Sequence, residues 1–183
     1  MADVIIVGGG PAGYSAALFT SKYGLDTVVY DTDDSKMHSA YLWNYLGIQE
    51  MHGSDFLNVA REQVEEYGTE IRKEKITSAA VAEAGFTVET EGGASESAPY
   101  LVVATGLNND LLKNLGVEME GKEAKVGHNG ETSIDNLYAV GWTSRNQSQA
   151  IISAGDGAAA ALHLIAQVEG KPYHDFDVPP SDA

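Results

Sequence analysis

The glycine-rich stretch GGGPAG at residues 8–13 has the residue types and spacing that bind a pyrophosphate. In a G-x-G-x-x-G turn, Gly8 permits the tight bend, Gly10 lets a pyrophosphate approach the backbone, and Gly13 allows a helix to pack closely on a strand. The N-terminus of that helix adds free N–H groups and a partial positive charge. Glycine-rich turns also occur for structural reasons alone, so the turn needs a second signal.

An acidic residue, Asp31, supplies that second signal. It follows Gly8 by 23 positions, at the end of the next expected strand. A carboxylate there accepts hydrogen bonds from the hydroxyls of an adenosine ribose and repels a 2′-phosphate, which makes NADP a poor ligand. The turn and the acid together predict a dinucleotide-binding site.

These residues must be positioned by a strand, a turn, a helix and a second strand. The β-branched run Val4–Val7 predicts a strand that is buried on both faces. The stretch Pro11–Tyr23 predicts a helix that begins on a proline and ends at Gly24. The next strand is expected at Thr27–Tyr30, which completes a right-handed βαβ unit in a parallel sheet.

The rest of the chain predicts two further helices and several more strands. One helix is expected over Ser54–Tyr67, with Ser54 as its N-cap. An alanine-rich helix is expected over Gln149–Val168, with its run of alanines packed tightly on the sheet. The other strands are expected at Glu70–Lys73, Ile76–Val81, Phe86–Thr90, Leu101–Ala104 and Leu137–Val140.

Three stretches are expected to lack regular structure. The polar, glycine- and serine-bearing segment 91–99 predicts an exposed loop, and the poorly patterned segment 107–136 predicts a linker-like connection. The tail 173–183 is polar and holds two prolines, so it is expected to be irregular. The sequence therefore predicts one domain over residues 1–172.

Charge is the unusual feature of the composition. The chain of 183 residues holds 27 acidic and 11 basic side chains, for a net charge of −16. Nucleic acid is a poor partner, because phosphate binding requires clusters of Lys and Arg. The acidity indicates a solvated surface that favours solubility, as in a halophilic, high-salt cytoplasm; the alternative is an acidic docking face for a basic partner.

The residue inventory excludes several kinds of chemistry. The chain has no cysteine, which removes disulfides, thiolate metal sites and any cysteine redox pair or nucleophile. Its five histidines are scattered without ligand spacing, so no metal site is expected. No basic n-region and no long apolar run are present, which predicts a cytoplasmic protein without a signal peptide or membrane span.

Four ordered segments together resemble the thioredoxin reductase-like flavoproteins. They are GGGPAGYSAAL, WNYLGI with the helix after it, YLVVATG, and ETSIDNLYAVG followed by SQAIISAGDGAAAAL. The resemblance covers residues 1–106 and 130–172. It implies an α/β fold, a single Rossmann-like doubly wound FAD-binding domain with a small β-meander insert, and FAD as the cofactor.

The chain also departs from that family. Members normally carry a second, NAD(P)H-binding domain with its own glycine loop and usually a CxxC pair, whereas only residues 107–136 occupy that place here. The resemblance therefore extends to the FAD domain alone. It implies that this chain does not reduce a disulfide through its own thiols and that its flavin ring is more exposed than usual.

The resemblance assigns cofactor-binding roles by position. Asp31 meets the adenosine ribose, and the backbone of Ile76 lies near the adenine. Asn44 borders the flavin ring. Gln149 and Ala150 open the last helix toward the pyrimidine end of the isoalloxazine, where a helix N-terminus stabilises the negative charge of the reduced ring. The residues that the resemblance places along the pyrophosphate and in the dinucleotide-binding crevice are Gly8, Gly10, Pro11, Ala12, Gly13, Ala104, Thr105 and Gly106.

Several of these residues have simpler explanations. Asn44 is equally suited to a turn, and Gln149 to a polar helix end. The alternating aromatic residues of 41–45 either stack on the flavin or pack as a half-buried strand or loop. Arg145 is either an anion or flavin contact or a lone exposed arginine.

The pair Gly141–Trp142 is the clearest departure within a matching segment. In the family this stretch ends in Gly-Asp, and the aspartate grips the ribityl hydroxyls of FAD. An indole has one N–H donor and no acceptor, so Trp142 cannot make that contact. Either Thr143 or Ser144 replaces the acid, or the ribityl is held less firmly, or the indole covers the flavin, or Trp142 serves only packing.

The sequence thus predicts a single-domain FAD-binding flavoprotein that performs oxidoreduction or electron transfer and pairs as a homodimer. No side chain stands out as a catalytic acid, base or nucleophile, so the cofactor carries the reaction. Reducing equivalents would come from an external redox protein or donor. The alternatives are a non-catalytic dinucleotide sensor or scaffold, an NAD-dependent enzyme, and a subunit whose partner supplies the nicotinamide domain.

Overall fold

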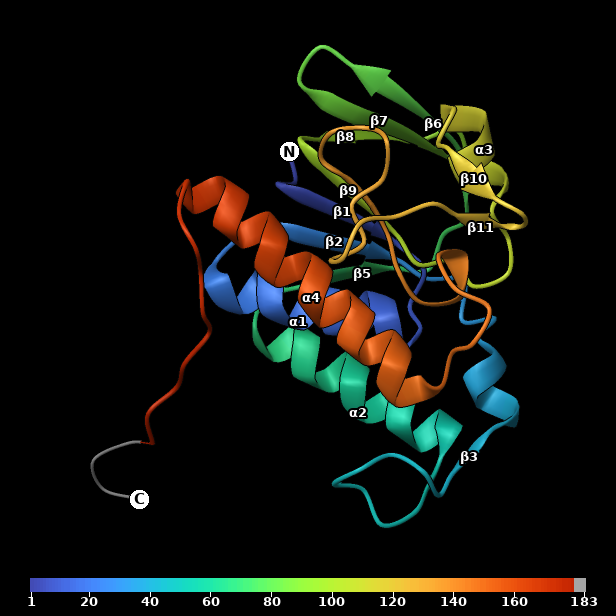
Figure 1. Ribbon diagram of the computed structural model, residues 1–183, viewed down its shortest axis with the longest axis vertical. Coiled ribbons are helices and arrows are strands. Elements are labelled where there is room, and N and C mark those ends of the chain that lie inside the picture. Colours follow the sequence, from blue (N-terminus) through green and yellow to red (C-terminus); the bar gives the residue numbers. More distant parts are fainter. Residues whose placement is uncertain (180–183) are drawn as a thin grey trace.

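A five-stranded parallel sheet forms the middle layer of the protein (Figure 1). The computed structural model describes residues 1–179, so the last four residues of the predicted irregular tail lie outside the described part. From one edge to the other, the strands are β12 (Leu137–Ala139), β9 (Tyr100–Val103), β1 (Val4–Val7), β2 (Thr27–Tyr30) and β5 (Glu70–Arg72).

The strand order reverses next to β1. The chain moves outward from β1 to β2 and β5, then returns to place β9 on the opposite side of β1. All neighbouring strands are parallel, and Val7 lies between Tyr30 and Val103 in register. The carboxyl ends of the strands therefore meet at one edge, with a topological switch point between β1 and β9. The predicted doubly wound α/β fold is confirmed.

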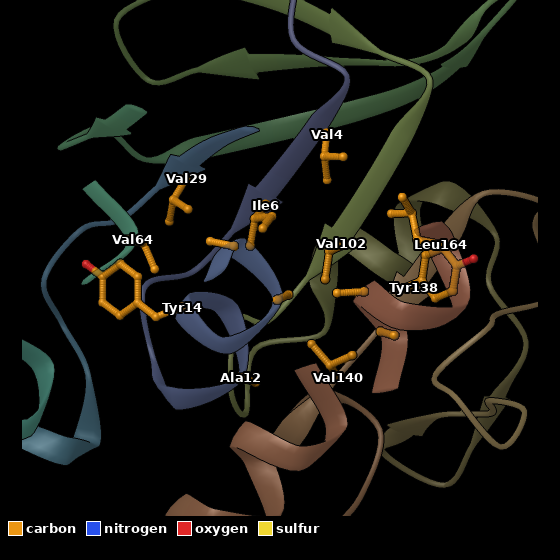
Figure 2. Close-up of a cluster of buried hydrophobic side chains, with 14 of the residues drawn as sticks. Val4, Ile6, Ala12, Tyr14, Val29, Val64, Val102, Tyr138, Val140 and Leu164 are labelled. Carbon is orange, nitrogen blue, oxygen red and sulfur yellow. The ribbon is translucent and has the colours of Figure 1, made fainter. Parts of the chain in front are cut away.

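Three helices cover one face of this sheet: α1 (Pro11–Tyr23), α2 (Gly53–Glu66) and α4 (Ala150–Glu169). Figure 2 shows the apolar cluster between these layers, to which the sheet contributes alternate strand residues. Because the other strand residues face the opposite side, the sheet is apolar on both faces. The residues labelled in this cluster are Val4, Ile6, Ala12, Tyr14, Val29, Val64, Val102, Tyr138, Val140 and Leu164.

A three-stranded antiparallel meander covers the other face. It consists of β6 (Ile76–Ala82), β7 (Gly85–Thr90) and β8 (Ser95–Ala98), and its Phe86 and Val88 are buried in one apolar cluster with Ile5 of the sheet. The prediction of a loop over 91–99 was wrong, because β8 forms there. The short polar side chains of β8 belong to a strand that pairs with β7, and the hydroxyls of Thr87 and Ser97 hydrogen bond at 2.8 Å across that pair. The polarity of this segment therefore does not mark a loop.

Residues 107–136 are not a linker. They form α3 (Asp110–Leu115), β10 (Met119–Glu120) and β11 (Glu123–Ala124), and the last two pair as a short hairpin. Leu112 is fully buried in the cluster on the meander side of the sheet. The linker prediction failed because these elements are too short to produce a periodic pattern.

The loop between β2 and α2 carries η1 (Lys36–Ser39) and the strand pair β3 (Tyr41–Leu42) and β4 (Met51–His52). Ser54 does not cap α2 as predicted. The helix begins one residue earlier, at Gly53, with His52 at the N-cap position and no side-chain cap. A Cβ at Gly53 would lie 1.9 Å from the Met37 carbonyl oxygen, so α2 begins in close contact with η1.

Helices α4 and α1 pack in close backbone contact. A Cβ at Gly157 would lie 2.0 Å from the Ala12 carbonyl oxygen, and Ala160 and Ala161 are fully buried nearby. By length and composition α4 is the one described helix that is apolar enough to cross a membrane. Its buried face belongs to the core between the helices and the sheet, which is the arrangement of a core helix.

The contact between α1 and α4 predicts opposite effects of alanine at two glycines of α4. Gly157→Ala places a methyl group into the Ala12 carbonyl, and we expect a loss of about 1–3 kcal/mol in the free energy of unfolding. Gly155→Ala meets nothing within 4 Å and should gain about 0.5–1 kcal/mol, because alanine favours a helix. Urea denaturation of both variants measures the difference, and equal effects would contradict the packing described.

Candidate functional site

The turn after β1 has the room and the free donors that a phosphate requires. Gly8 has a φ of +112°, and a Cβ there would lie 2.4 Å from the Ala104 carbonyl oxygen. A Cβ at Gly10 would meet only the Ser35 hydroxyl oxygen, at 3.8 Å, so the space over this residue is open. Pro11 is the first residue of α1, and no side chain caps its N-terminus. This turn is therefore an open cradle lined by backbone N–H groups.

The same turn is fixed to its neighbours at the switch point. A Cβ at Gly13 would lie 1.8 Å from the Gly8 carbonyl oxygen, so α1 contacts β1 directly. The Ala104 N–H donates to the Val7 carbonyl at 2.8 Å, which places the turn after β9 beside the glycine turn. In that second turn, the Thr105 hydroxyl donates to the Asn108 carbonyl at 2.5 Å. The 104–106 turn therefore begins in direct contact with the glycine turn.

Asp31 lies directly after β2 and is buried. Its carbon Cγ would be 2.2 Å from a Cβ at Gly9, so the carboxylate lies over the glycine turn. The Tyr14 hydroxyl donates to Asp31 Oδ2 at 2.7 Å, and Arg61 Nη2 lies 3.4 Å from the same oxygen. Burial and the bond to Asp31 raise the pKa of Tyr14 well above that of a free tyrosine. The predicted ribose-binding acid is therefore held in place by two donors.

A second acid, Asp33, extends this network. Arg61 Nη2 lies 3.0 Å from Asp33 Oδ1, and His38 Nε2 lies 3.0 Å from the same oxygen. Burial works to raise the pKa of Asp33, but the hydrogen bonds from His38 and Arg61 outweigh it and hold that pKa below its usual value. Sequence reasoning missed these residues, although Arg61 is the one basic side chain in the acidic helix α2.

The two residues assigned to the flavin ring by resemblance lie together. The Asn44 side-chain amide donates to Gln149 Oε1 at 3.1 Å, although 105 positions separate them in the chain. Gln149 immediately precedes α4, and Ala150 is its first residue. Trp43 is 73% exposed and its ring centroid lies 4.6 Å from that of Tyr41. This end of the site is therefore an exposed, aromatic-rich surface.

Trp142 lies in η2 (Gly141–Thr143), which follows β12. Its indole N–H donates to the Ser148 carbonyl at 3.3 Å, so the indole is bonded to its own loop. Thr143 is fully buried, and its hydroxyl donates to the Val140 carbonyl at 2.6 Å, so this hydroxyl does not face a ligand. Gly141 has a φ of +67°, and a Cβ there would lie 3.1 Å from Ala12 Cβ. The η2 turn thus contacts the start of α1.

Asn109 connects the 107–136 segment to that turn. Its side-chain amide donates to the carbonyls of Thr143 at 3.1 Å and Lys122 at 2.7 Å. The residue is 5% exposed, and its Oδ1 atom has no partner among the described residues. Nothing in the sequence around Asn109 indicated this role, because its two partners are backbone groups distant in the chain.

Arg145 and Ile76 were also singled out from the sequence. Arg145 is not a lone arginine, because its Nη2 lies 2.9 Å from Asp156 Oδ1. Burial raises the pKa of Asp156, although Arg145 and the Gly141 N–H act in the opposite direction. Ile76 is the first residue of β6, where it pairs with Thr90 and packs against the meander-side core. Within the described residues, no three His, Asp or Glu side chains are placed to hold a metal ion.

An open glycine cradle, a buried acid and a strand switch point define a Rossmann-like dinucleotide-binding domain. Residues 2–45 and 45–158 match the family model described as pyridine nucleotide-disulphide oxidoreductase, and the chain belongs to this family. It is a thioredoxin reductase-like flavoprotein of a family of oxidoreductases, and FAD is the cofactor of that family.

Individual relatives support this assignment. The chain is 26% identical over 166 residues to a ferredoxin–NADP reductase of Levilactobacillus brevis, covering 86% of this chain and 47% of the relative. It is 27% identical over 161 residues to a thioredoxin reductase of Streptomyces coelicolor, covering 85% and 48%. It therefore spans about half the length of the curated relatives it matches. A thioredoxin reductase structure from Gloeobacter violaceus shares the fold, with a TM-score of 0.85, 21% identity and coverage of 98% of this chain and 99% of that one.

The buried bond between Tyr14 and Asp31 predicts a stability effect. Tyr14→Phe removes one donor from a buried carboxylate, and we expect a loss of about 1–3 kcal/mol in the free energy of unfolding. Tyr23→Phe is the matched control on the same helix, because the Tyr23 hydroxyl bonds Glu169 at the surface and its loss should matter less. Chemical denaturation near neutral pH compares the two variants.

The pH dependence of that difference provides a further check. A raised pKa means that the neutral Tyr14 contributes stability below the ordinary tyrosine pKa of about 10, and that this stability is lost as the pH rises toward the folded-state value. The gap between the wild type and Tyr14→Phe should therefore shrink above about pH 10. A gap that stays constant across that range contradicts the arrangement.

Proposed function

We propose that this chain is a single-domain FAD-binding flavoprotein that transfers electrons between external partners. The open backbone cradle at Gly10, beside the buried Asp31, is the observation that carries the proposal. FAD fits the residues present, because the position over Gly10 is open, the Asp31 carboxylate lies beside the glycine turn, and Asn44 and Gln149 form a hydrogen-bonded pair of uncharged polar groups. When bound, FAD supplies the redox chemistry.

Each group of residues has a proposed binding role. The backbone from Gly8 to Gly13, with Pro11 and Ala12 at the start of α1, holds the pyrophosphate, and Asp31 orients the adenosine ribose. The backbone of Ile76 borders the adenine.

The remaining residues are assigned to the crevice and the ring end of the cofactor. Ala104, Thr105 and Gly106 line the crevice. Asn44, Gln149 and Ala150 fix the ring end, and Gly141 and Trp142 lie beside the ribityl chain.

The electron donor and acceptor are proposed to be separate molecules. The chain has no cysteine, and residues 107–136 fold onto the sheet as α3, β10 and β11 rather than forming a second domain. An external redox protein, a diffusing donor or a partner that carries an NAD(P)H domain would fill this role. One relative is named a ferredoxin–NADP reductase, which favours a protein donor or acceptor of this class.

A second candidate is a dinucleotide sensor or scaffold without redox chemistry. It is favoured by Trp142, which occupies the place of an acid that the family uses to hold the ribityl chain. The two candidates differ in one measurement, since a sensor keeps a bound flavin that NADH, NADPH and reduced ferredoxin all fail to reduce. The same cradle would also serve an NAD-binding enzyme or a subunit of a larger complex.

We also infer that two copies pair through the surface around the ring end. Residues 41–49 and 146–155 contain no Asp, Glu, Lys or Arg, although the chain carries a net charge of −16. Two strongly acidic molecules repel each other least where carboxylates are absent. Leu46 is 89% exposed on this surface. Sedimentation equilibrium tests the pairing, and a monomer at every concentration contradicts it.

The cytoplasmic location of the protein stays a prediction.

Absorption spectroscopy tests the proposed cofactor directly. We expect the purified chain to carry bound flavin, or to bind added FAD with the visible absorption bands of a protein-bound flavin, because the cradle is already formed. Gly10→Val is the informative variant, since its side chain enters the open space over the turn and should abolish binding. A colourless protein that does not bind added FAD would falsify the proposal.

Trp142 is expected to cover part of the bound cofactor. Trp142→Ala removes an aromatic contact and should raise the FAD dissociation constant roughly threefold to tenfold while increasing flavin fluorescence. Trp142→Phe keeps an aromatic ring and should stay close to the wild type. Fluorescence titration measures both variants. Unchanged affinity and emission in Trp142→Ala mean that the indole serves packing alone.

A further inference from the structure

The guanidinium of Arg61 lies between two carboxylates at the adenosine end of the site. Its Nη2 atom is 3.0 Å from Asp33 Oδ1 and 3.4 Å from Asp31 Oδ2. Its Nε donates to the Tyr14 hydroxyl at 3.1 Å, and its guanidinium carbon lies 5.9 Å from the centroid of that ring. The side chain therefore extends from α2 to the loop after β2, where both acids engage it.

Of the two acids, Asp33 is the one that faces solvent. The side chain of Asp31 is 8% exposed, whereas that of Asp33 is 38% exposed. The loop that carries both acids continues to Ser35, whose hydroxyl borders the open space over Gly10. A ligand that lies in the cradle with its ribose at Asp31 thus has Asp33 and Arg61 as its next charged neighbours.

Arginine and carboxylate have opposite effects on a dinucleotide at this place. A guanidinium near the ribose binds a 2′-phosphate in a bidentate manner, and a carboxylate excludes the phosphate and accepts the 2′-hydroxyl. This chain has both, but the carboxylates hold the guanidinium. His38 and Lys73 also contact Asp33, with Lys73 Nζ 4.0 Å from Asp33 Oδ2.

We propose that Asp33 and Arg61 set the selectivity of the adenosine end. Asp33 keeps the Arg61 guanidinium from binding a 2′-phosphate, so the site takes dinucleotides with a free 2′-hydroxyl. Neutralising Asp33 releases Arg61 as a phosphate-binding group. The inference rests on the adenosine end of the proposed site, and it goes beyond that proposal by assigning selectivity to a pair outside the glycine turn and Asp31.

The test compares two probes that differ by one phosphate. Isothermal titration of the flavin-free full chain measures ADP-ribose and 2′-phospho-ADP-ribose. The wild type should favour ADP-ribose by more than about tenfold, and Asp33→Asn should narrow that ratio by about tenfold because Arg61 is freed. The double variant Asp33→Asn with Arg61→Gln should return to the wild-type ratio, because it has no guanidinium at position 61 to bind the 2′-phosphate. Asp34→Asn is the control, since Asp34 is exposed and makes no ion pair within the described residues.

The inference is overturned if Asp33→Asn keeps the wild-type ratio of the two dissociation constants, or if the ratio stays narrowed in the double variant. A change of the same size in Asp34→Asn also overturns it, because net charge would then explain the effect.

A separate titration with FAD distinguishes this inference from the cofactor proposal. If ADP-ribose binds and FAD does not, the cofactor proposal fails and the selectivity result still stands. If none of the three binds, both proposals fail.

Discussion

Backbone contact at two glycines of the helical layer is the constraint on which the rest of the structure depends. Helix α1 touches β1 through Gly13 and touches α4 through Gly157, at distances that leave no room for a Cβ. These contacts aim the N-terminus of α1 at the switch point and bring the turn at Gly141 against Ala12. The cradle, the η2 turn and the start of α4 therefore form one rigid frame at the carboxyl edge of the sheet.

Much of this frame was predictable from sequence because its signals are local. Val4–Val7, Pro11–Tyr23 and Thr27–Tyr30 were predicted with the bounds that the structure shows, since β-branched runs, an initial proline and a terminal glycine mark them. The meander followed from the family resemblance and was confirmed, but its third strand was missed. The polar residues of β8 and the short elements of 107–136 form through tertiary pairing, which local sequence does not report.

The site was predictable to a lesser degree. The resemblance named Asn44 and Gln149, and the structure places them in contact, while their role toward a cofactor stays a prediction. Sequence reasoning missed Arg61 and Asn109, because each acts through groups that only folding brings near. Together these residues suggest a division of labour. In the proposals above, backbone shape holds the phosphates, the charge network of Asp31, Asp33 and Arg61 selects the adenosine end, and the uncharged surface at the ring end serves pairing between two copies.

The most direct test of the central claim is a crystal structure of this chain grown with FAD. We expect electron density for the pyrophosphate over Gly10 at the N-terminus of α1, with the adenosine ribose at Asp31 and the isoalloxazine beside Asn44 and Gln149. Density for FAD at another place, with the space over Gly10 free of ligand, would contradict the proposed binding site.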